Sequence, residues 1–344
     1  MADQRFLLVR LGSLGDIIFT LPTVAALRDT FPSAKIDWLV DARWRSLVEG
    51  NPDLTEAIVL PDRSAGTFIA CGKSLRARKY SCAIDIQALY KSAVLARISG
   101  APQRIGFTRE FVRERGAEWF YTQRVAPREP HMVEQNLALA YAAGAKPGAP
   151  RFPLQISPEA RAFADQTLSR LALNNFGVLS LGGGWLSKCW PAARFGELAR
   201  VIFERHGLRF LINCGPGESE MAREATAAAG PAAPQIIEAK LGQLMEFLRR
   251  ARIVVAADSG PLHLAVALGT PVVGLFGPTS PARNGPYCKA DIVVRNATAS
   301  DTTYKRNNAY SAAMLSITVD QVVNAVERRL GLTSAPPATA PSAS

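Results

Sequence analysis

Three short segments of the sequence combine glycines with charged side chains, and each could hold an anionic ligand. The first contains Gly12, Ser13, Gly15 and Asp16 directly after an apolar run, and its two glycines let the backbone approach a ligand closely. The spacing is GxxGD, so the GxGxxG fingerprint of dinucleotide binding is not met. Asp16 is therefore either a carboxylate that faces a ligand or a simple helix cap, which is a common role of aspartate.

The second segment contains Gly182, Gly183, Gly184 and Lys188, just before a helix predicted to start after Pro191. Backbone N–H groups, a helix N-terminus and one lysine together form a cradle for phosphate. The GxxxxGK[ST] spacing of a Walker A loop is absent from this segment. The alternative is a flexible connecting loop with an exposed lysine.

The third segment contains Asp258, Ser259, Gly260 and His263, between an apolar run and a helix predicted over 262–268. The N–H groups of Ser259 and Gly260 would face a phosphate at the helix start, and Asp258 could accept hydrogen bonds from sugar hydroxyls. His263 lies one turn into that helix, where it either contacts the ligand or is a structural group.

These segments need a scaffold that brings the ends of several buried strands to one edge. Short apolar runs alternate with amphipathic stretches, which is typical of βα units around a parallel sheet. The turn Gly277–Thr279 follows one of these runs and would border the third segment. The eight runs predicted to be strands are Phe6–Val9, Ile36–Val40, Ala57–Leu60, Ala83–Ile86, Gly177–Leu181, Phe210–Asn213, Ile253–Ala256 and Val272–Phe276.

A Pro/Gly segment at Lys146–Pro150 interrupts this alternation, and a new series starts at Phe176. We therefore expect two α/β domains, over residues 1–150 and 151–332. Residues 333–344 are Ala, Pro, Ser and Thr only, so they cannot bury a core and should form a disordered tail.

The composition limits the class of protein. Of the 344 residues, 48% are hydrophobic and 20% are charged, as in a soluble globular protein. No apolar stretch is long enough to cross a membrane, and the first residues lack the pattern of a signal peptide, so we expect a cytoplasmic protein. The five cysteines form no CxxC pair, the three histidines show no ligand spacing, and no DxD pair occurs. We therefore expect neither a disulfide framework nor a bound metal.

The charge is strongly basic. The chain carries 40 Lys and Arg against 29 Asp and Glu, a formal net charge of +11 that is spread over both halves. Such an excess suggests nucleic acid, a membrane surface or a phosphorylated small molecule as the partner, or else only a well-solvated surface. Nucleic acid is disfavoured, because the basic residues are not interleaved with an aromatic stacking platform and no binding motif is present.

Taken together, the three segments resemble the ADP-heptose:lipopolysaccharide heptosyltransferases, glycosyltransferase family 9. The resemblance covers about residues 5–330 and rests on Arg10–Pro32, Gly182–Ala199 and Asp258–Pro281. It implies the α/β fold called GT-B, in which two Rossmann-like domains face each other across a cleft. The first domain would hold the acceptor and the second the nucleotide-sugar. One departure is the stretch 302–309, which lacks the cysteine that many relatives carry there.

The resemblance also implies a reaction. Heptose would pass from ADP-heptose to the Kdo/heptose inner core of lipopolysaccharide, with inversion and without a metal. ADP-heptose would be a substrate, so no cofactor is expected. The acceptor would be an anionic glycolipid of the lipid A–Kdo type, met by an enzyme peripherally associated with the inner membrane.

The resemblance also implies a role for individual residues. Asp16 would be the general base, Lys188 would contact the donor diphosphate, and Asp258 would hold the heptose hydroxyls. A helix N-terminus lowers the pKa of a carboxylate such as Asp16 and makes it a weaker base, whereas desolvation acts in the opposite direction. The expected donor-binding residues are Gly183, Gly184, Lys188, Asp258, Ser259, Gly260 and His263. The expected acceptor-binding residues are Ser13, Gly15, Lys73, Arg76, Arg104 and Arg109.

Two basic clusters belong to the acceptor prediction. We expect both to face the phosphorylated lipid and the anionic membrane surface. The first consists of Lys73, Arg76, Arg78 and Lys79, and the second of Arg104, Arg109, Arg113 and Arg115.

Two alternatives stay open at this stage. The chain could act on another nucleotide-sugar or acceptor, or it could bind a nucleotide-sugar without catalysis. The presence of both Asp16 and Lys188 argues against the second alternative.

Overall fold

The computed structural model describes residues 4–62, 64–215, 217–298 and 300–332. They form two compact units: one runs to Pro158 and includes Ala282–Asn284, and the other comprises Glu159–Pro281 and the chain from Gly285 onward. The predicted tail, 333–344, lies outside the described residues. In the part of the chain that is described, no helix is both long and apolar enough to cross a membrane.

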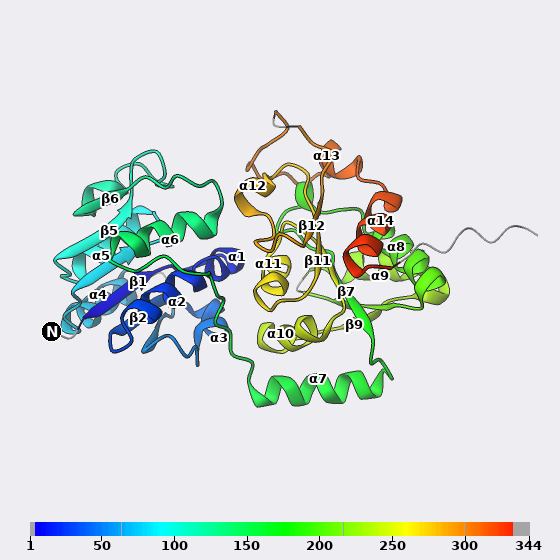
Figure 1. Ribbon diagram of the computed structural model, residues 1–344, viewed down its shortest axis with the longest axis horizontal. Helices are drawn as coiled ribbons and strands as arrows, with labels where there is room; N and C mark the ends of the chain where they lie inside the picture. The colour runs from blue at the N-terminus through cyan, green and yellow to red at the C-terminus, as the bar shows by residue number, and fades with distance from the viewer. Residues whose placement is uncertain (1–3, 63, 216, 299, 333–344) are drawn as a thin grey trace, which may run out of the picture. The chain divides into compact units, whose positions relative to one another are not determined.

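The described residues of the first unit contain a parallel sheet of six strands in the order β3-β2-β1-β4-β5-β6 (Figure 1). The direction in which successive strands are added to the sheet reverses between β1 and β4, as in a Rossmann-like sheet. The loops that follow these two strands therefore lie side by side at the carboxyl edge. The strands are β1 (Arg5–Val9), β2 (Lys35–Asp41), β3 (Glu56–Leu60), β4 (Cys82–Asp85), β5 (Gln103–Phe107) and β6 (Gln123–Val125).

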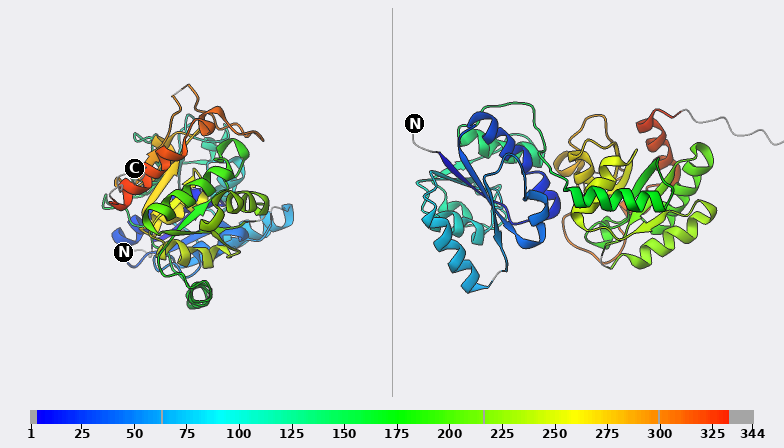
Figure 2. Two further views of the ribbon diagram at one scale, coloured as in Figure 1. Left: turned by 90° about the vertical axis from the view of Figure 1, so that its right-hand side faces the viewer. Right: turned by 90° about the horizontal axis from the view of Figure 1, so that it is seen from below.

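Helices cover both faces of this sheet. Helices α2 and α6 pack together, and so do α4 and α5; Figure 2 shows the two pairs on opposite sides of the strands. The helices of this unit are α1 (Leu14–Ile18), α2 (Leu21–Thr30), α3 (Arg45–Val48), α4 (Ala65–Ala77), α5 (Tyr90–Ile98) and α6 (Met132–Ala142), with 3₁₀ turns η1 (Ala42–Trp44) and η2 (Ala117–Phe120).

The described part of the second unit contains a second parallel sheet of six strands, in the order β12-β11-β10-β7-β8-β9. Here β7 and β10 are the central neighbours, so the loops that follow them lie side by side. The strands are β7 (Phe176–Ser180), β8 (Arg209–Asn213), β9 (Gln235–Ile237), β10 (Val254–Ala257), β11 (Val272–Leu275) and β12 (Ile292–Val294).

Helix α8 packs against both α9 and α14, whereas α10 packs against α11. Helix α8 follows the predicted pattern: Phe195, Leu198 and Ile202 are buried on one face, and Gly207 ends the helix with a left-handed φ of 66°. The helices are α7 (Pro158–Arg170), α8 (Ala192–His206), α9 (Ser219–Ala229), α10 (Leu241–Arg250), α11 (Gly260–Ala267), α12 (Pro281–Asn284), α13 (Ala312–Leu315) and α14 (Val319–Leu330), with 3₁₀ turns η3 (Leu186–Lys188) and η4 (Gly230–Ala232).

All eight predicted strands are present, and the structure adds β5, β6, β9 and β12. Strand β5 was missed because it begins with Gln103 and Arg104. The other three lie at sheet edges and are only three residues long, so they contain too few apolar residues to form a recognisable run.

The first unit extends eight residues past the predicted boundary at 150, because the connecting segment is tied to it. Arg151 contacts two carboxylates, Asp29 at 2.6 Å and Asp53 at 2.5 Å. The side-chain amide of Asn51 donates to the carbonyl of Pro153 at 2.9 Å. The Pro/Gly segment therefore belongs to the surface of the first unit, and the chain leaves that unit near Pro158.

Candidate active site

Asp16 is the third residue of α1, and its carboxylate caps that helix. Oδ2 of Asp16 accepts hydrogen bonds from the backbone N–H of Ser13 at 3.0 Å and from the Ser13 hydroxyl at 3.2 Å. Asp16 does therefore cap the helix, as one of the two interpretations of this residue predicts. This role does not account for the rest of the carboxylate's surroundings.

Two arginines flank the same carboxylate. Nη2 of Arg10, the residue directly after β1, lies 2.5 Å from Oδ1 of Asp16, and Nη1 donates to the carbonyl of Ile86 at 2.6 Å. Nη2 of Arg113, from the loop after β5, donates to both Asp16 oxygens at 3.0 and 3.1 Å. Arg10 is almost completely buried, whereas the side chain of Arg113 is 38% exposed.

These contacts shift the pKa values of both partners. Burial alone would raise the pKa of Asp16, but the charges of Arg10 and Arg113 outweigh it and hold this pKa at about 2. Burial lowers the pKa of Arg10 to about 10, which leaves the guanidinium charged at neutral pH. Asp16 is therefore ionised, and its affinity for a proton is low.

In the second unit, Lys188 ends η3 and is largely buried. Its Nζ lies 2.9 Å from Oδ2 of Asp258 and 4.6 Å from the centre of the Trp185 ring. Gly183 permits this placement, because a Cβ at that position would lie 3.0 Å from Cβ of Lys188. The alternative of an exposed lysine on a connecting loop is therefore wrong.

Asp258 follows β10 and joins Lys188 to His263. Nε2 of His263 lies 3.2 Å from Oδ1 of Asp258, and both side chains are buried. Burial would raise the pKa of Asp258, but the hydrogen bond with His263 and the charge of Lys188 hold it well below its ordinary value. The predicted lysine, aspartate and histidine thus form one contact cluster at the carboxyl edge of the second sheet.

The start of α11 completes this cluster. Ser259 is its N-cap, and Gly260 is its first residue, so their backbone N–H groups lie at the positive end of the helix. The hydroxyls of Ser187, Ser259 and Thr279 are buried and have no hydrogen-bond partner among the described residues. They lie in loops after the adjacent strands β7, β10 and β11. Buried polar atoms without partners are rare in a protein and suit a site that a polar ligand fills.

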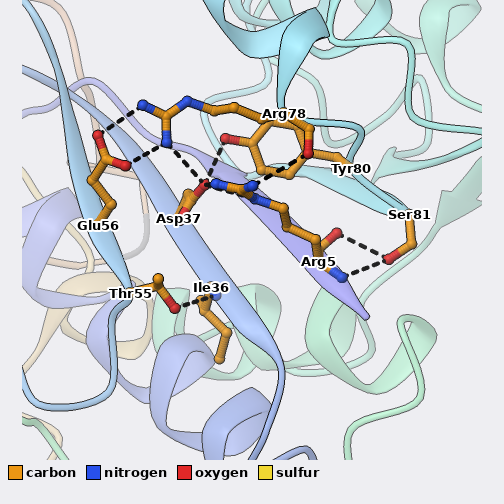
Figure 3. Close-up of polar contacts among 8 residues, drawn as sticks. All are labelled: Arg5, Ile36, Asp37, Thr55, Glu56, Arg78, Tyr80 and Ser81. Atoms are coloured by element: carbon orange, nitrogen blue, oxygen red, sulfur yellow. Dashed lines mark hydrogen bonds and ion pairs between the residues drawn. The ribbon is translucent and has the colours of Figure 1, made fainter. Parts of the chain in front are cut away.

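The structure does not bring the first basic cluster to Asp16. Helix α4 carries Lys73 and Arg76 from the carboxyl edge toward the amino edge, and Arg76 lies beside Gly100, just before β5. Arg78 pairs with Glu56 and Asp37 at the amino ends of β3 and β2 (Figure 3). Lys73 and Arg76, which we expected to bind the acceptor, are therefore not grouped with Asp16.

Figure 3 also shows why Arg78 is not free to hold a ligand. Oδ2 of the buried Asp37 accepts from Arg5 at 2.7 Å, from Tyr80 at 2.8 Å and from Arg78 at 3.5 Å. The hydrogen bonds with Glu56 raise the pKa of Arg78. These contacts join the amino ends of the first strands and stabilise the fold there.

The second basic cluster is divided between the two edges of the sheet. Arg104 lies near the amino end of β5 and donates to the carbonyls of Phe120 and Ala101, both at 2.8 Å. Arg109 lies in the loop after β5, at the carboxyl edge, and is exposed. That loop also supplies Arg113, so it is the part of the cluster that reaches Asp16.

Two Rossmann-like units, each built on a parallel sheet with charged side chains at its carboxyl edge, define the GT-B class of glycosyltransferase fold. The profile of glycosyltransferase family 9 (heptosyltransferase) matches residues 68–313, and this chain belongs to that family. The protein is therefore an enzyme that transfers a sugar.

Relatives and solved structures agree with this assignment. Lipopolysaccharide heptosyltransferase 1 of Pseudomonas aeruginosa is 31% identical over 308 residues, covering 84% of this chain and 83% of that protein. Lipopolysaccharide core heptosyltransferase OpsX of Haemophilus influenzae is 26% identical over 300 residues, covering 85% and 84%. The structure of Escherichia coli ADP-heptose LPS heptosyltransferase II superposes with a TM-score of 0.79 at 25% identity, covering 95% of this chain and 98% of that one.

Proposed function

We propose that this enzyme transfers heptose from ADP-heptose to the Kdo/heptose inner core of lipopolysaccharide. The observation that carries the proposal is the buried cluster of Lys188, Asp258 and His263 at the start of α11. The names of the relatives, which describe lipopolysaccharide heptosyltransferases, support the choice of sugar and acceptor.

The second unit has the groups that a nucleotide-sugar needs. Lys188 and the N–H groups of Ser259 and Gly260 would bind the diphosphate and stabilise the charge that develops as ADP leaves. Asp258, already ionised, would accept hydrogen bonds from heptose hydroxyls. Since Lys188 and the helix supply positive charge, we propose that the reaction does not require a metal or a cofactor.

In the first unit, Asp16 would act as the general base. It would remove the proton of an acceptor hydroxyl as that oxygen attacks the anomeric carbon, and the configuration at that carbon would invert. A pKa of about 2 makes Asp16 a weak base in the ligand-free enzyme. We propose that an anionic acceptor draws Arg113 away from Asp16, whereas the buried Arg10 remains and keeps the carboxylate in place.

The acceptor is an anionic glycolipid in this proposal. Arg109, Arg113 and the segment with Ser13 and Gly15 lie at the carboxyl edge of the first sheet, and they would contact this acceptor. We propose that the enzyme works in the cytoplasm and meets the acceptor at the inner membrane.

A turnover assay tests the proposal. The purified enzyme would be given ADP-heptose with a lipid A–Kdo acceptor or an already heptosylated one, and, in parallel, UDP- and GDP-sugars with the same acceptors. We expect turnover with ADP-heptose, unchanged after treatment with EDTA. If the enzyme turned over only another nucleotide-sugar, the proposed donor would be wrong. Loss of activity with EDTA would contradict the proposal that no metal is required. If no inner-core acceptor were turned over, the proposed acceptor would be wrong.

A further inference from the structure

The first unit exposes three aromatic side chains on segments around the start of α5. The exposed fractions are 74% for Trp119, 47% for Tyr90 and 38% for Phe111. They come from α5, from η2 and from the loop between β5 and η2. Single exposed apolar residues are ordinary in proteins, but exposed tryptophan is uncommon, and several aromatics on neighbouring elements suggest a binding surface.

We call Tyr90, Phe111 and Trp119 the aromatic patch, and the first and last of these lie side by side. The rings of Tyr90 and Trp119 both lie within 4 Å of the place where a Cβ on Gly116 would stand. Tyr90 also packs edge-on against Phe120, with ring centres 5.2 Å apart.

Phe111 belongs to the same loop, whose base is fixed by packing. Its neighbour Val112 packs against a small core cluster of Ala93, Ala117 and Tyr121. The backbone of the next residue, Arg113, donates to the carbonyl of Ala88 at 3.0 Å. The rings of the patch therefore stand on a folded base, where ordering them on binding costs little entropy.

The charges around the patch are predominantly basic. Lys91, Arg109 and Arg115 are exposed beside it, and Arg113 is partly exposed. The acidic residues of the same segments are Glu110 and Glu114, which are exposed, and Glu118, which is buried and accepts from the backbone N–H of Gly116 at 2.7 Å. The carboxylate of Glu114 accepts from the backbone N–H of Tyr90 at 2.6 Å. Aromatic rings with a polar tip, flanked by Lys and Arg, are the composition that favours the headgroup region of an anionic bilayer.

We propose that the aromatic patch docks on the surface of an anionic lipid bilayer, with Trp119, Tyr90 and Phe111 in the headgroup region. This inference rests on the proposed function only in that the acceptor is lipid-linked. The loop that carries Phe111 also carries Arg113, which contacts Asp16. A bilayer seated on the patch would thus present its glycolipids beside the proposed base. The patch replaces the cluster Lys73–Lys79, which runs toward the opposite edge of the sheet.

The first test measures binding to vesicles without donor or acceptor. Wild type, Trp119→Ala and the double variant Phe111→Ala/Trp119→Ala would be sedimented with vesicles of phosphatidylglycerol and phosphatidylcholine or of phosphatidylcholine alone. We expect wild type to bind the anionic vesicles, more weakly in high salt, and the double variant to bind at least about fivefold more weakly. Ile236→Ala in the second unit, with a side chain 43% exposed, is the matched control and should bind like wild type.

The second test compares acceptors. On a lipid acceptor embedded in vesicles, the double variant should lose activity in proportion to its binding. On the same saccharide freed of its acyl chains, it should turn over like wild type. If the double variant lost activity equally on both acceptors, the rings would stack on the saccharide. If its vesicle binding were unchanged, the rings would not meet the bilayer. Either result overturns the proposal. Because the vesicle test contains no substrate, its outcome is independent of the proposed donor.

Discussion

The ammonium group of Lys188 lies 2.9 Å from a carboxylate oxygen of Asp258, and both side chains are largely buried. The positive charge of Lys188 is therefore paired with the carboxylate of Asp258 until a ligand competes for the lysine. A diphosphate offers several oxygens to Lys188 at once, and sugar hydroxyls can then donate to the carboxylate that the lysine releases. The pair would thus keep the proposed donor site ordered before the donor arrives.

Replacing Lys188 should separate donor binding from the rest of the fold. In Lys188→Ala we expect the affinity for ADP to fall by about tenfold or more, because a charge-assisted contact is worth about 1.5–3 kcal/mol. Thermal stability should fall too, since Asp258 loses its cation in a buried position. Calorimetric titration with ADP measures the first effect, with Lys305→Ala, an exposed lysine of the same unit, as control. An ADP dissociation constant within about twofold of wild type would remove Lys188 from the donor site.

Asp16→Asn should abolish most turnover but leave donor binding intact. The amide cannot take a proton, and general base catalysis typically contributes about 10²–10⁴-fold. The affinity for ADP should be unchanged, because the groups proposed to bind ADP all lie in the second unit. Asp62→Asn, at an exposed carboxylate, is the control for turnover. Turnover of Asp16→Asn within a few-fold of wild type would show that another group is the base.

Arg113→Gln should change the pH dependence of the reaction. Arg113 is one of the two cations that lower the pKa of Asp16, so removing it raises that pKa and leaves Arg10 in place. Since the base works ionised, the acid limb of the kcat/KM profile should move to higher pH than in wild type. Arg113→Lys should restore much of the wild-type profile, and Arg115→Gln should not alter it. A role limited to binding the acceptor would change the height of the profile but not the position of this limb.

Asp85 should make folding stability depend on pH between its ordinary pKa of 3.8 and its raised pKa of about 6. It is buried after β4 and accepts hydrogen bonds from Ser92 and Tyr121, yet burial raises its pKa from 3.8 to about 6. Between these values the folded state holds a proton that the unfolded chain has released. Stability from this group is therefore complete below pH 3.8 and falls by about 3 kcal/mol as pH rises to about 6.

Urea unfolding from about pH 4 to about pH 8 checks this dependence. In Asp85→Asn the decrease should disappear, because the amide stays neutral throughout. Asp320→Asn, at an exposed carboxylate of α14, should keep the wild-type slope. Parallel curves for wild type and Asp85→Asn would contradict the raised pKa.

Two glycines in helices should respond in opposite directions to alanine. A Cβ on Gly196 in α8 would stand 2.1 Å from the carbonyl oxygen of Ala225 in α9, whereas a Cβ on Gly242 in α10 meets nothing within 4 Å. Gly196→Ala should lower the free energy of unfolding by about 1–3 kcal/mol, since two packed helices must move apart. Gly242→Ala should leave it unchanged or raise it by about 0.5–1 kcal/mol. Denaturant unfolding measures both, and equal effects would contradict the close approach of α8 and α9.

The central strands and the residues of the cluster in the second unit could be predicted because their signals are local. Each buried strand is a short apolar run, and Lys188, Asp258 and His263 each lie in a segment whose glycines and helix start are visible in the sequence. That Lys188 touches Asp258 was not predicted, because this contact depends on β7 and β10 being neighbours in the sheet.

The partners of Asp16 show where local reasoning ends. Arg10 stands in the same segment as Asp16, directly after the strand, and this position was the available signal for it. Arg113 is 97 residues away from Asp16 along the chain, and nothing near it in sequence sets it apart from Arg109 or Arg115. For Lys73 and Arg76, clustered charge gave no information about which edge of the sheet the helix carries them to.

The two ion pairs of Arg151, with Asp29 and Asp53, determine where a shortened chain can end. A fragment that ends at residue 150 would lose the guanidinium that neutralises Asp53, a carboxylate whose side chain is only 8% exposed, and would leave Asp29 without its partner. A fragment that continues to Pro158 keeps both pairs and the bond between Asn51 and Pro153. The first unit of the enzyme should therefore be produced alone as residues 1–158, so that its binding to lipids and saccharides can be studied in isolation.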